Sequence, residues 1–119
     1  MPPSSRITRT REIRKLLRSG KRRKTSHLDV FFLSSEEPRP RVGLVVPKYR
    51  RSAVDRNLVK RRLRELSRRE VVPRLMASSV SLDLLIRARR EAYDVRYGQL
   101  RLELLKVTEE LCSGQSSWG

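Results

Sequence analysis

Positive charge is the feature of this sequence that most restricts how the chain can fold. The chain holds 29 Lys and Arg against 13 Asp and Glu, a formal net charge of +16. The window 6–24 carries a net +9 and the window 48–69 a net +8, so the remaining residues together are close to neutral. Like charges at this density repel one another in a compact body unless a polyanion neutralises them. We therefore expect a fold that displays both windows to a nucleic acid.

Length and composition restrict the class of protein further. At 119 residues the chain is predicted to form one domain over 1–119, with an ordered core over 6–112 and a frayed tail over 113–119. No stretch approaches the roughly 20 apolar residues of a membrane span, and the N-terminus lacks the apolar segment of a signal peptide. A single Cys and a single His exclude an internal disulfide and a Cys/His zinc cluster. These features predict a soluble cytoplasmic protein with no membrane partner and no small-molecule substrate.

A helix is predicted near each end of the chain. The first begins at Thr8 or Thr10, either of which can cap its N-terminus, and ends at Gly20. Its apolar residues recur at helical spacing, as Ile13, Leu16 and Leu17. The last helix is expected to be capped by Asp94 and to end near Cys112. Its apolar face, which should cover the sheet, consists of Tyr97, Leu100, Leu104, Val107 and Leu111.

Three segments between these helices are predicted to be strands. The segments 27–33, 41–47 and 81–88 are rich in β-branched and other apolar residues, with partial alternation. A helix separates the second from the third, so these two strands are expected to be parallel neighbours in a β-α-β unit. The sequence therefore predicts an α+β fold in a single small domain. The element order is α-β-β(β)-α-β-α, with the bracketed strand optional, around a central mixed sheet.

The helix of the β-α-β unit is predicted to run from Asp55 to about Val71, because Pro73 should block its continuation. At about 100° per residue, one side of it is apolar, with Leu58, Val59, Leu63 and Leu66. Arg62 also falls on that side and must either reach past it to solvent or break the pattern. The other side is a cationic strip that can contact successive phosphates. It consists of Arg56, Asn57, Lys60, Arg61, Arg64 and Arg68.

This segment resembles the signature of the ribonuclease P protein family. The run VGLVVPK is followed by AVDRNLVKRRLRE, and the family pattern includes Ala-Val-x-Arg-Asn-x-x-Lys-Arg-x-x-Arg. Every fixed position of that pattern is matched, by Ala53, Val54, Arg56, Asn57, Lys60, Arg61 and Arg64. The likeness extends to the basic first helix ending at Gly20, the strand that holds Phe31, and the run from Ile86 to Arg89.

The resemblance implies a function as well as a fold. Members of this family are non-catalytic protein subunits of ribonuclease P, a ribonucleoprotein endoribonuclease that removes the 5′ leader of precursor tRNA. The implied partners are the catalytic RNase P RNA and precursor tRNA, and the implied cofactor is Mg²⁺ bound mainly by the RNA. No residue of the protein is then catalytic, and none is expected to bind a metal. The resemblance also implies a left-handed β-α-β crossover, although such crossovers are right-handed in about 98% of cases.

Two sites follow from the resemblance. The residues expected to bind the catalytic RNA are Arg56, Asn57, Lys60, Arg61, Arg64, Arg68, Lys48 and Arg51. The leader is expected to lie in a cleft between the first helix and the sheet, beside Ile13, Leu17, Phe31, Tyr49 and Arg89. Phe31 fits two interpretations, a stacking platform for a base or a core residue.

This sequence departs from the family pattern at three places. Ile13 and Leu17 stand where the family usually has aromatic residues that stack on leader bases. The run 50–52 replaces a Gly-containing loop that is often associated with metal binding. Leu58 stands where the family often has another basic residue.

Three other functions fit part of the sequence. A ribosomal protein would share the size and charge, so that only the spacing of the signature argues against it. A protein-only nuclease would need converging carboxylates, whereas Asp29, Asp55 and Asp83 fall on separate predicted elements. A helix-turn-helix DNA-binding protein needs two adjacent helices, whereas predicted strands flank the basic helix on both sides.

Overall fold

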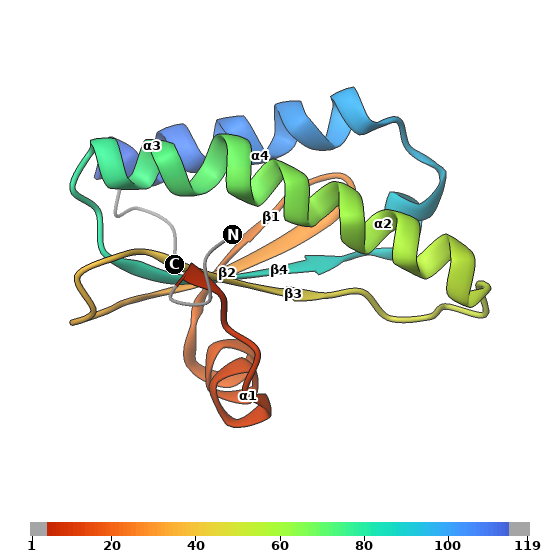
Figure 1. Ribbon diagram of the computed structural model, residues 1–119, viewed down its shortest axis with the longest axis horizontal. Coiled ribbons are helices and arrows are strands. Elements are labelled where there is room, and N and C mark those ends of the chain that lie inside the picture. Colours follow the sequence, from red (N-terminus) through yellow and green to blue (C-terminus); the bar gives the residue numbers. More distant parts are fainter. Residues whose placement is uncertain (1–4, 115–119) are drawn as a thin grey trace.

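A four-stranded sheet lies at the centre of the protein in this computed structural model, which describes residues 5–114 (Figure 1). In chain order its strands are β1 Lys21–Lys24, β2 Leu28–Ser34, β3 Arg41–Val45 and β4 Leu82–Ala88. Across the sheet the order is β1-β2-β4-β3. The pairs β1–β2 and β2–β4 are antiparallel, whereas β3 and β4 are parallel. The predicted mixed sheet and its parallel pair are therefore confirmed.

The optional strand of the prediction is β1. It consists of four consecutive cations, KRRK, so its sequence lacks the alternation that marks a half-buried strand. It pairs Lys21 with Phe32 and Lys24 with Asp29 along the edge of the sheet. Charged side chains on an edge strand discourage pairing with other chains. This strand forms because β2 offers it backbone groups that would otherwise be unpaired, and not because its own residues favour a strand.

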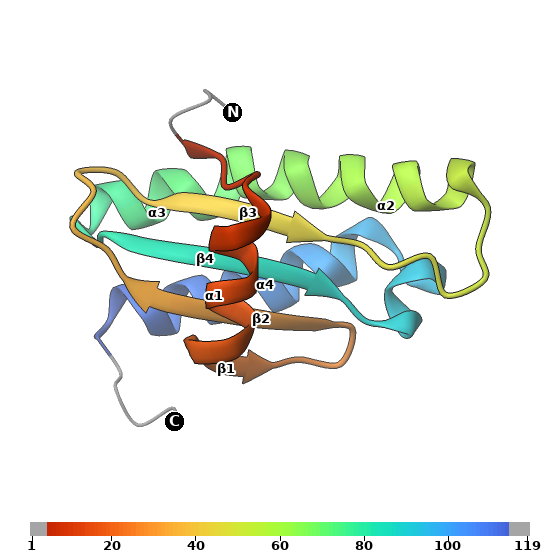
Figure 2. The ribbon, with the colours of Figure 1, turned by 90° about the horizontal axis from the view of Figure 1, so that it is seen from below.

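Helices cover both faces of the sheet (Figures 1 and 2). One face packs against three helices in a layer and the other against a single helix that crosses the strands. None of the helices in residues 5–114 has both the length and the apolar character needed to cross a bilayer. The helical elements are α1 Thr10–Ser19, α2 Ala53–Leu66, the π-helical turn Ser67–Val71, α3 Val72–Ala77, the 3-10 turn Arg90–Asp94 and α4 Tyr97–Cys112.

The connection from β3 to β4 is left-handed. Figure 2 shows β3 and β4 side by side and pointing the same way, with α1 in front of the sheet and α2 and α3 behind it. The chain leaves β3, returns behind the sheet through α2 and α3, and enters β4 on the side that makes a left-handed turn. This is the handedness that the family resemblance implied, against the general preference for right-handed crossovers.

Strand β2 buries side chains on both of its faces, which creates two cores. Leu28, Val30 and Phe32 belong to the larger core between the sheet and the layer of α2, α3 and α4. Phe31 and Leu33 point to the opposite face, into the smaller core beneath α1. A strand covered on both faces is apolar almost throughout rather than strictly alternating. This explains why the predicted alternation of β2 was only partial.

An ion cluster ties α1 to the sheet. The Arg41 guanidinium at the start of β3 lies 2.8 Å from the Asp83 carboxylate on β4 and 2.8 Å from the Glu12 carboxylate on α1. All three side chains are largely sheltered from solvent, so water screens the attraction only partly. The cluster therefore helps to set where α1 lies on its face of the sheet.

The predicted caps of the first and last helices are wrong. The N-cap of α1 is Arg9 and that of α4 is Arg96, and neither makes a side-chain capping bond. Asp94 lies instead in the 3-10 turn before α4, where its carboxylate accepts a 2.6 Å hydrogen bond from Arg51. A tertiary ion pair has therefore taken the carboxylate that local sequence assigned to capping. The tail predicted over 113–119 begins as a turn at residues 113–114, and residues 115–119 lie outside the described residues.

Gly20 ends α1 as predicted, but for a different reason from the usual one. Its φ of −71° is accessible to any residue, so no left-handed backbone is required. A side chain at this position would instead place its Cβ 2.5 Å from the carbonyl oxygen of Leu16. The glycine is needed for close approach of the backbone as the chain turns into β1.

Helix α2 does not stop at Pro73. Its N-cap is Ser52, whose hydroxyl accepts a 3.1 Å hydrogen bond from the Asp55 amide. At its other end the π-helical turn shifts the hydrogen-bonding register, and α3 begins at Val72. Pro73 is then in the first turn of a new helical segment, where a missing amide proton costs little. The predicted end of the helix is therefore wrong, although its predicted start is within two residues.

A buried carboxylate holds α4 to the turn between β1 and β2. Glu103 on α4 is 8% exposed. Its carboxylate accepts hydrogen bonds from the Thr25 hydroxyl at 2.5 Å, the backbone N–H of His27 at 3.0 Å and the side-chain amide of Gln99 at 3.0 Å. Its other close neighbour is the imidazole Nδ1 of His27, at 2.5 Å. Burial opposes ionisation of this group, but the hydrogen bonds outweigh burial and hold the pKa of Glu103 below its ordinary value of 4.5.

Replacing Glu103 with Gln should lower the free energy of unfolding by about 1–3 kcal/mol, because an amide cannot accept from all these donors. The difference should depend on pH. Since the pKa of Glu103 is lowered in the folded state, its contribution is full above the unfolded value and is lost as pH falls through the folded value. Thermal unfolding of the two proteins should therefore converge in acid. Glu109→Gln, at an exposed position of α4, is the control, and an equal effect there would contradict the assignment.

Candidate nucleic-acid interface

The outer face of α2 carries an open groove of about 540 Å³. Helical spacing of three and four residues places its lining side chains on successive turns of one face. The groove has no carboxylate in its lining, although Asp55 and Glu65 lie on the same helix. Its lining residues are Val54, Asn57, Leu58, Lys60, Arg61 and Arg64. The structure thus brings four predicted RNA-binding residues into one surface.

The apolar side of α2 is rotated slightly from its predicted position. Val59, Leu63 and Leu66 are buried as predicted. Leu58 was predicted to join them but lines the outer groove and is only half-buried, so that prediction is wrong. Helical spacing alone placed Leu58 on the side of the core, whereas the buried residues of α2 are Val59, Leu63 and Leu66, and Leu58 lies at their margin.

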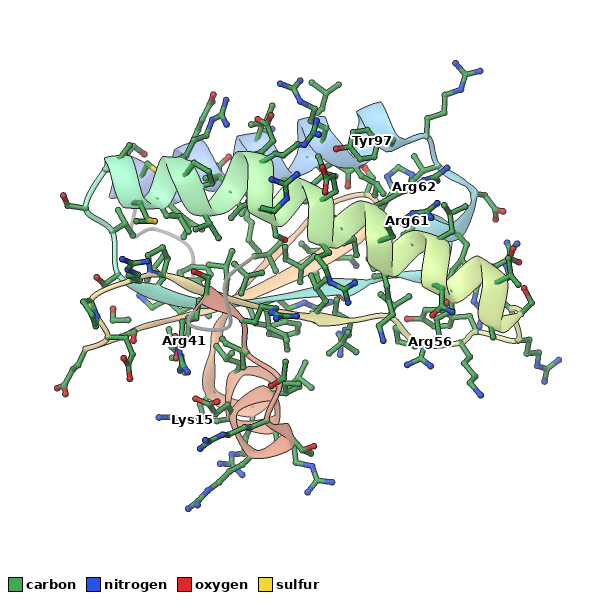
Figure 3. All side chains as sticks on the ribbon, viewed as in Figure 1. Lys15, Arg41, Arg56, Arg61, Arg62 and Tyr97 are labelled. Atoms are coloured by element: carbon green, nitrogen blue, oxygen red, sulfur yellow. The ribbon has the colours of Figure 1, made fainter. Side chains whose placement is uncertain are left out.

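Arg56 is the second residue that the rotation affects. It was predicted on the cationic strip, but its Nε donates a 2.7 Å hydrogen bond to the Val46 carbonyl at the end of β3 (Figure 3). The side chain therefore holds α2 to the chain that precedes it, and its predicted outward position is wrong. A role for Arg56 in RNA binding stays a prediction. Arg62 is half-buried, and its Nη1 donates a 3.4 Å hydrogen bond to the Val95 carbonyl.

Three further predicted RNA-binding residues differ in whether a carboxylate already pairs with their positive charge. Arg68 is exposed, but its guanidinium lies 2.6 Å from the Glu65 carboxylate. Arg51 lies 2.6 Å from the Asp94 carboxylate and 5.3 Å from the ring centre of Tyr93. Lys48, by contrast, is exposed in the loop before α2. Lys48 and the cations that line the groove are therefore better candidates for phosphate contacts than Arg51 and Arg68.

A second, smaller hollow joins the two basic windows. It measures about 200 Å³ and lies between the N-terminal segment, β3 and α2. The N-terminal segment is held there by a bridge to β3, in which the Ile7 amide donates to the Val42 carbonyl at 3.0 Å. Arg6 consequently lines the same hollow as Lys60 and Arg64. Arg6 falls in the first basic window of the sequence, but no local feature indicates that it lies near residues so far along the chain.

Helix α1 adds a further group of cations on the other face of the sheet. Its half-buried residues Ile13 and Leu17 pack toward the sheet. Its basic residues point away from the body of the protein, as Figure 3 shows for Lys15. The exposed cations of this helix are Arg11, Arg14, Lys15 and Arg18.

Phe31 is a core residue, which decides between the two interpretations of it. It is 5% exposed and packs with Ile7, Leu16 and Leu85 beneath α1. Its ring is also covered by guanidinium groups, with Arg87 at 5.0 Å and Arg22 at 5.8 Å from the ring centre. The ring is therefore not an open stacking platform in this structure.

Asp29 holds the two arginines over Phe31. Its carboxylate lies 2.8 Å from Arg22 and 3.1 Å from Arg87. The residue is 3% exposed. Burial opposes its ionisation, but the hydrogen bonds and charges of the two arginines outweigh burial and lower the pKa of Asp29. The carboxylate is therefore ionised and fully committed to these guanidinium groups.

The two remaining residues predicted for the leader cleft lie at the end of β4. Tyr49 donates a 3.2 Å hydrogen bond to the Ala88 carbonyl, and its ring meets Tyr93 edge-on at 6.2 Å. Arg89 donates a 3.0 Å hydrogen bond to the Thr25 carbonyl. Ile13 and Leu17 share the small core with Phe31, whereas Tyr49 and Arg89 make their contacts around the end of β4. The structure therefore divides the five residues between two places.

Two carboxylates at the sheet are already bound by arginines and are therefore not available to a metal ion. Asp29 is held by two arginines and Asp83 by Arg41. Within residues 5–114, no three or more His, Cys, Asp or Glu side chains gather in a way that could hold a metal ion. A carboxylate that already neutralises a guanidinium is a poor ligand for Mg²⁺, because the cation would have to displace it.

Comparison with known proteins gives a consistent result. A family model described as Ribonuclease P matches residues 1–112. The ribonuclease P protein component of Syntrophobacter fumaroxidans is 33% identical over 109 residues, which cover 92% of this chain and 83% of that protein. The corresponding protein of Thermus scotoductus is 36% identical over 94 residues, covering 79% of this chain and 52% of that protein.

Solved structures with the same fold include two RNase P proteins. The protein from Thermotoga maritima has a TM-score of 0.74 at 23% identity, over 88% of this chain and 96% of that chain. The protein from Staphylococcus aureus has a TM-score of 0.72 at 23% identity, over 88% of this chain and 95% of that chain. At this identity the two structures support the fold alone.

Replacing Arg61 with Ala should weaken binding to a structured RNA transcript. Losing one phosphate contact should also make the plot of log K against log salt shallower by about 0.9. Arg68→Ala is the matched control on the same helix, and its effect should be smaller because Glu65 already neutralises that arginine. Filter-binding titrations at several salt concentrations give both slopes. An unchanged slope for Arg61→Ala would show that the groove is not the contact, and equal changes for the two variants would show that the contact extends beyond the groove.

Proposed function

We propose, since this chain belongs to the ribonuclease P protein family, that it binds the catalytic RNA and the 5′ leader of precursor tRNA. In this proposal the ribonucleoprotein removes the leader by Mg²⁺-dependent hydrolysis, and the RNA carries out the chemistry. The protein contributes positive charge at fixed positions, which reduces the repulsion between two RNA molecules held close together.

The groove of α2 is the surface that we propose binds the catalytic RNA. Lys60, Arg61 and Arg64 line it without an acidic residue among them, and Arg6 joins the last part of the strip through the smaller hollow. If these four cations each neutralise one phosphate, the binding constant should fall with roughly the third to fourth power of salt concentration. The geometry suits a backbone that follows α2 and then turns toward the N-terminal segment.

The face beside α1 is proposed to hold the leader of precursor tRNA. Its exposed cations on α1 lie near a sheet surface that carries Arg22 and Arg87, two guanidinium groups that also face this side. Because Phe31 is covered, and Ile13 and Leu17 are aliphatic, stacking on aromatic rings is not what this face offers. We propose that contacts with phosphates and flat guanidinium groups hold the leader instead.

Magnesium is assigned to the RNA in this proposal. Within residues 5–114 no cluster of side chains suits the ion, and the carboxylates of Asp29 and Asp83 are already bound by arginines. Metal-assisted phosphodiester hydrolysis needs ions with open coordination positions beside the reacting phosphate. What the protein can do is lower the amount of free Mg²⁺ that the complex requires, since its own cations take over part of the charge neutralisation.

Reconstitution tests this proposal directly. Adding the purified protein to its cognate catalytic RNA should raise the rate of precursor-tRNA cleavage at low Mg²⁺, and the gain should shrink as Mg²⁺ increases. The rate is measured by gel separation of end-labelled precursor, with Arg61→Ala as the variant that gives a smaller gain. If the protein neither binds the RNA nor changes the cleavage rate, the proposed function is wrong.

The protein by itself should not cleave precursor tRNA. Incubation with precursor and Mg²⁺ in the absence of the catalytic RNA should leave the substrate intact, because no three or more His, Cys, Asp or Glu side chains within residues 5–114 gather where they could hold a metal ion. The same gel assay reports the result, and the reconstituted complex is the positive control. Specific cleavage at the mature 5′ end without RNA would identify a protein-only nuclease and overturn the mechanism.

A further inference from the structure

We infer that the groove of α2 receives one unstacked nucleobase of the RNA partner, which lies on Val54 and Leu58 while the surrounding cations hold its neighbouring phosphates. The inference rests on the proposed function, because it requires that α2 faces RNA. It adds a contact with a base to a surface for which only phosphate contacts have been proposed so far. The observation behind it is an apolar patch, Val54 and Leu58, in the same groove as the cations Lys60, Arg61 and Arg64.

Val54 is exposed to an unusual degree for a large apolar side chain. It is 78% exposed, compared with 60% for Leu102 and 46% for Met76, the other exposed large apolar residues of the described chain. Leu58 lies one helical turn further on and is half-buried in the lining of the same groove. Since Val54 contributes little buried area to either core, its apolar character is not explained by folding.

The chemistry around the patch suits a nucleotide. An aliphatic surface does not stabilise a bound phosphate. Moving the flat face of a base from water onto such a surface, by contrast, lowers the free energy. Asn57 lines the same groove and offers both a donor and an acceptor, which can pair with the edge of a base. Lys60, Arg61 and Arg64 lie further along the same helix, where they can neutralise the phosphates that follow the base.

A second copy of this chain is the main competing occupant, and its charge argues against it. Two copies meeting at this groove would bring Lys60, Arg61 and Arg64 of each against the same three cations of the other. Like charges facing one another across an interface oppose association. An RNA strand offers an apolar base face and negative phosphates together, and it is therefore the occupant that fits both parts of the lining.

A base contact of this kind has a signature that phosphate contacts lack. Neutralising a phosphate releases counterions and makes binding depend on salt. Burying a base on Val54 and Leu58 releases none, so it raises affinity at every salt concentration by the same factor. Loss of the apolar patch should consequently shift the plot of log K against log salt without changing its slope.

The test uses the full chain and its cognate catalytic RNA in filter-binding titrations over a series of salt concentrations. Val54→Thr keeps the shape of the side chain and makes it polar, and the double variant V54T/L58Q removes the whole apolar patch. The double variant is expected to bind about three- to tenfold more weakly with an unchanged slope. Leu102→Gln, at an exposed apolar position on α4 outside the groove, should bind like the wild type.

Three outcomes separate failure of the inference from failure of the proposed function. If V54T/L58Q binds like the wild type while Arg61→Ala loses both affinity and slope, α2 binds RNA but no base occupies the patch. If V54T/L58Q changes only the oligomeric state seen by sedimentation, a second copy occupies the groove and the inference is wrong. If the wild type shows no salt-dependent binding to the RNA, the proposed function fails and the inference fails with it. Circular dichroism melting of each variant confirms that it is folded, and Val54→Thr alone serves if the double variant is not.

Discussion

Burial of both faces of the central strand β4 is the constraint on which the rest of the structure depends. Leu84 and Ile86 face the large core under α2, α3 and α4, whereas Leu85 faces the small core under α1. A strand that is apolar on both faces must be covered on both. The two helical layers therefore have no alternative place to pack, and the cationic outer surfaces of α1 and α2 are carried to opposite sides of the sheet.

Carboxylates decide which arginines are structural. Asp29, Asp83 and Glu12 each hold an arginine at the sheet, and Glu65 and Asp94 hold others at the ends of helices. These pairs keep guanidinium groups in fixed places but leave them less charge for a ligand. The cations of the groove have no carboxylate in the same lining. The positions of the acidic residues therefore determine which arginines stabilise the fold and which remain available to a ligand.

The arrangement also explains how basic residues far apart in the sequence come to lie side by side on one surface. The bridge from the N-terminal segment to β3 brings Arg6 beside Lys60 and Arg64. From that point positive charge continues along α2 in one direction and toward α1 in the other. A ribonucleoprotein subunit needs this continuity, because RNA presents phosphates along a path and not at a point.

The sequence by itself determined the class of partner, the mixed sheet and the helix that carries the signature, because charge density, apolar spacing and the order of residues are local properties. It also determined that Asn57, Lys60, Arg61 and Arg64 share a face, since helical periodicity is enough for that. Only the tertiary structure decided the rest. The exact rotation of α2 on the sheet moved Leu58 outward and turned Arg56 to Val46. Long-range contacts likewise placed Arg6 at the site, covered Phe31 with two arginines and allowed the helix to continue past Pro73. Such outcomes depend on which distant side chains compete for the same space and the same charge, and no local pattern contains that information.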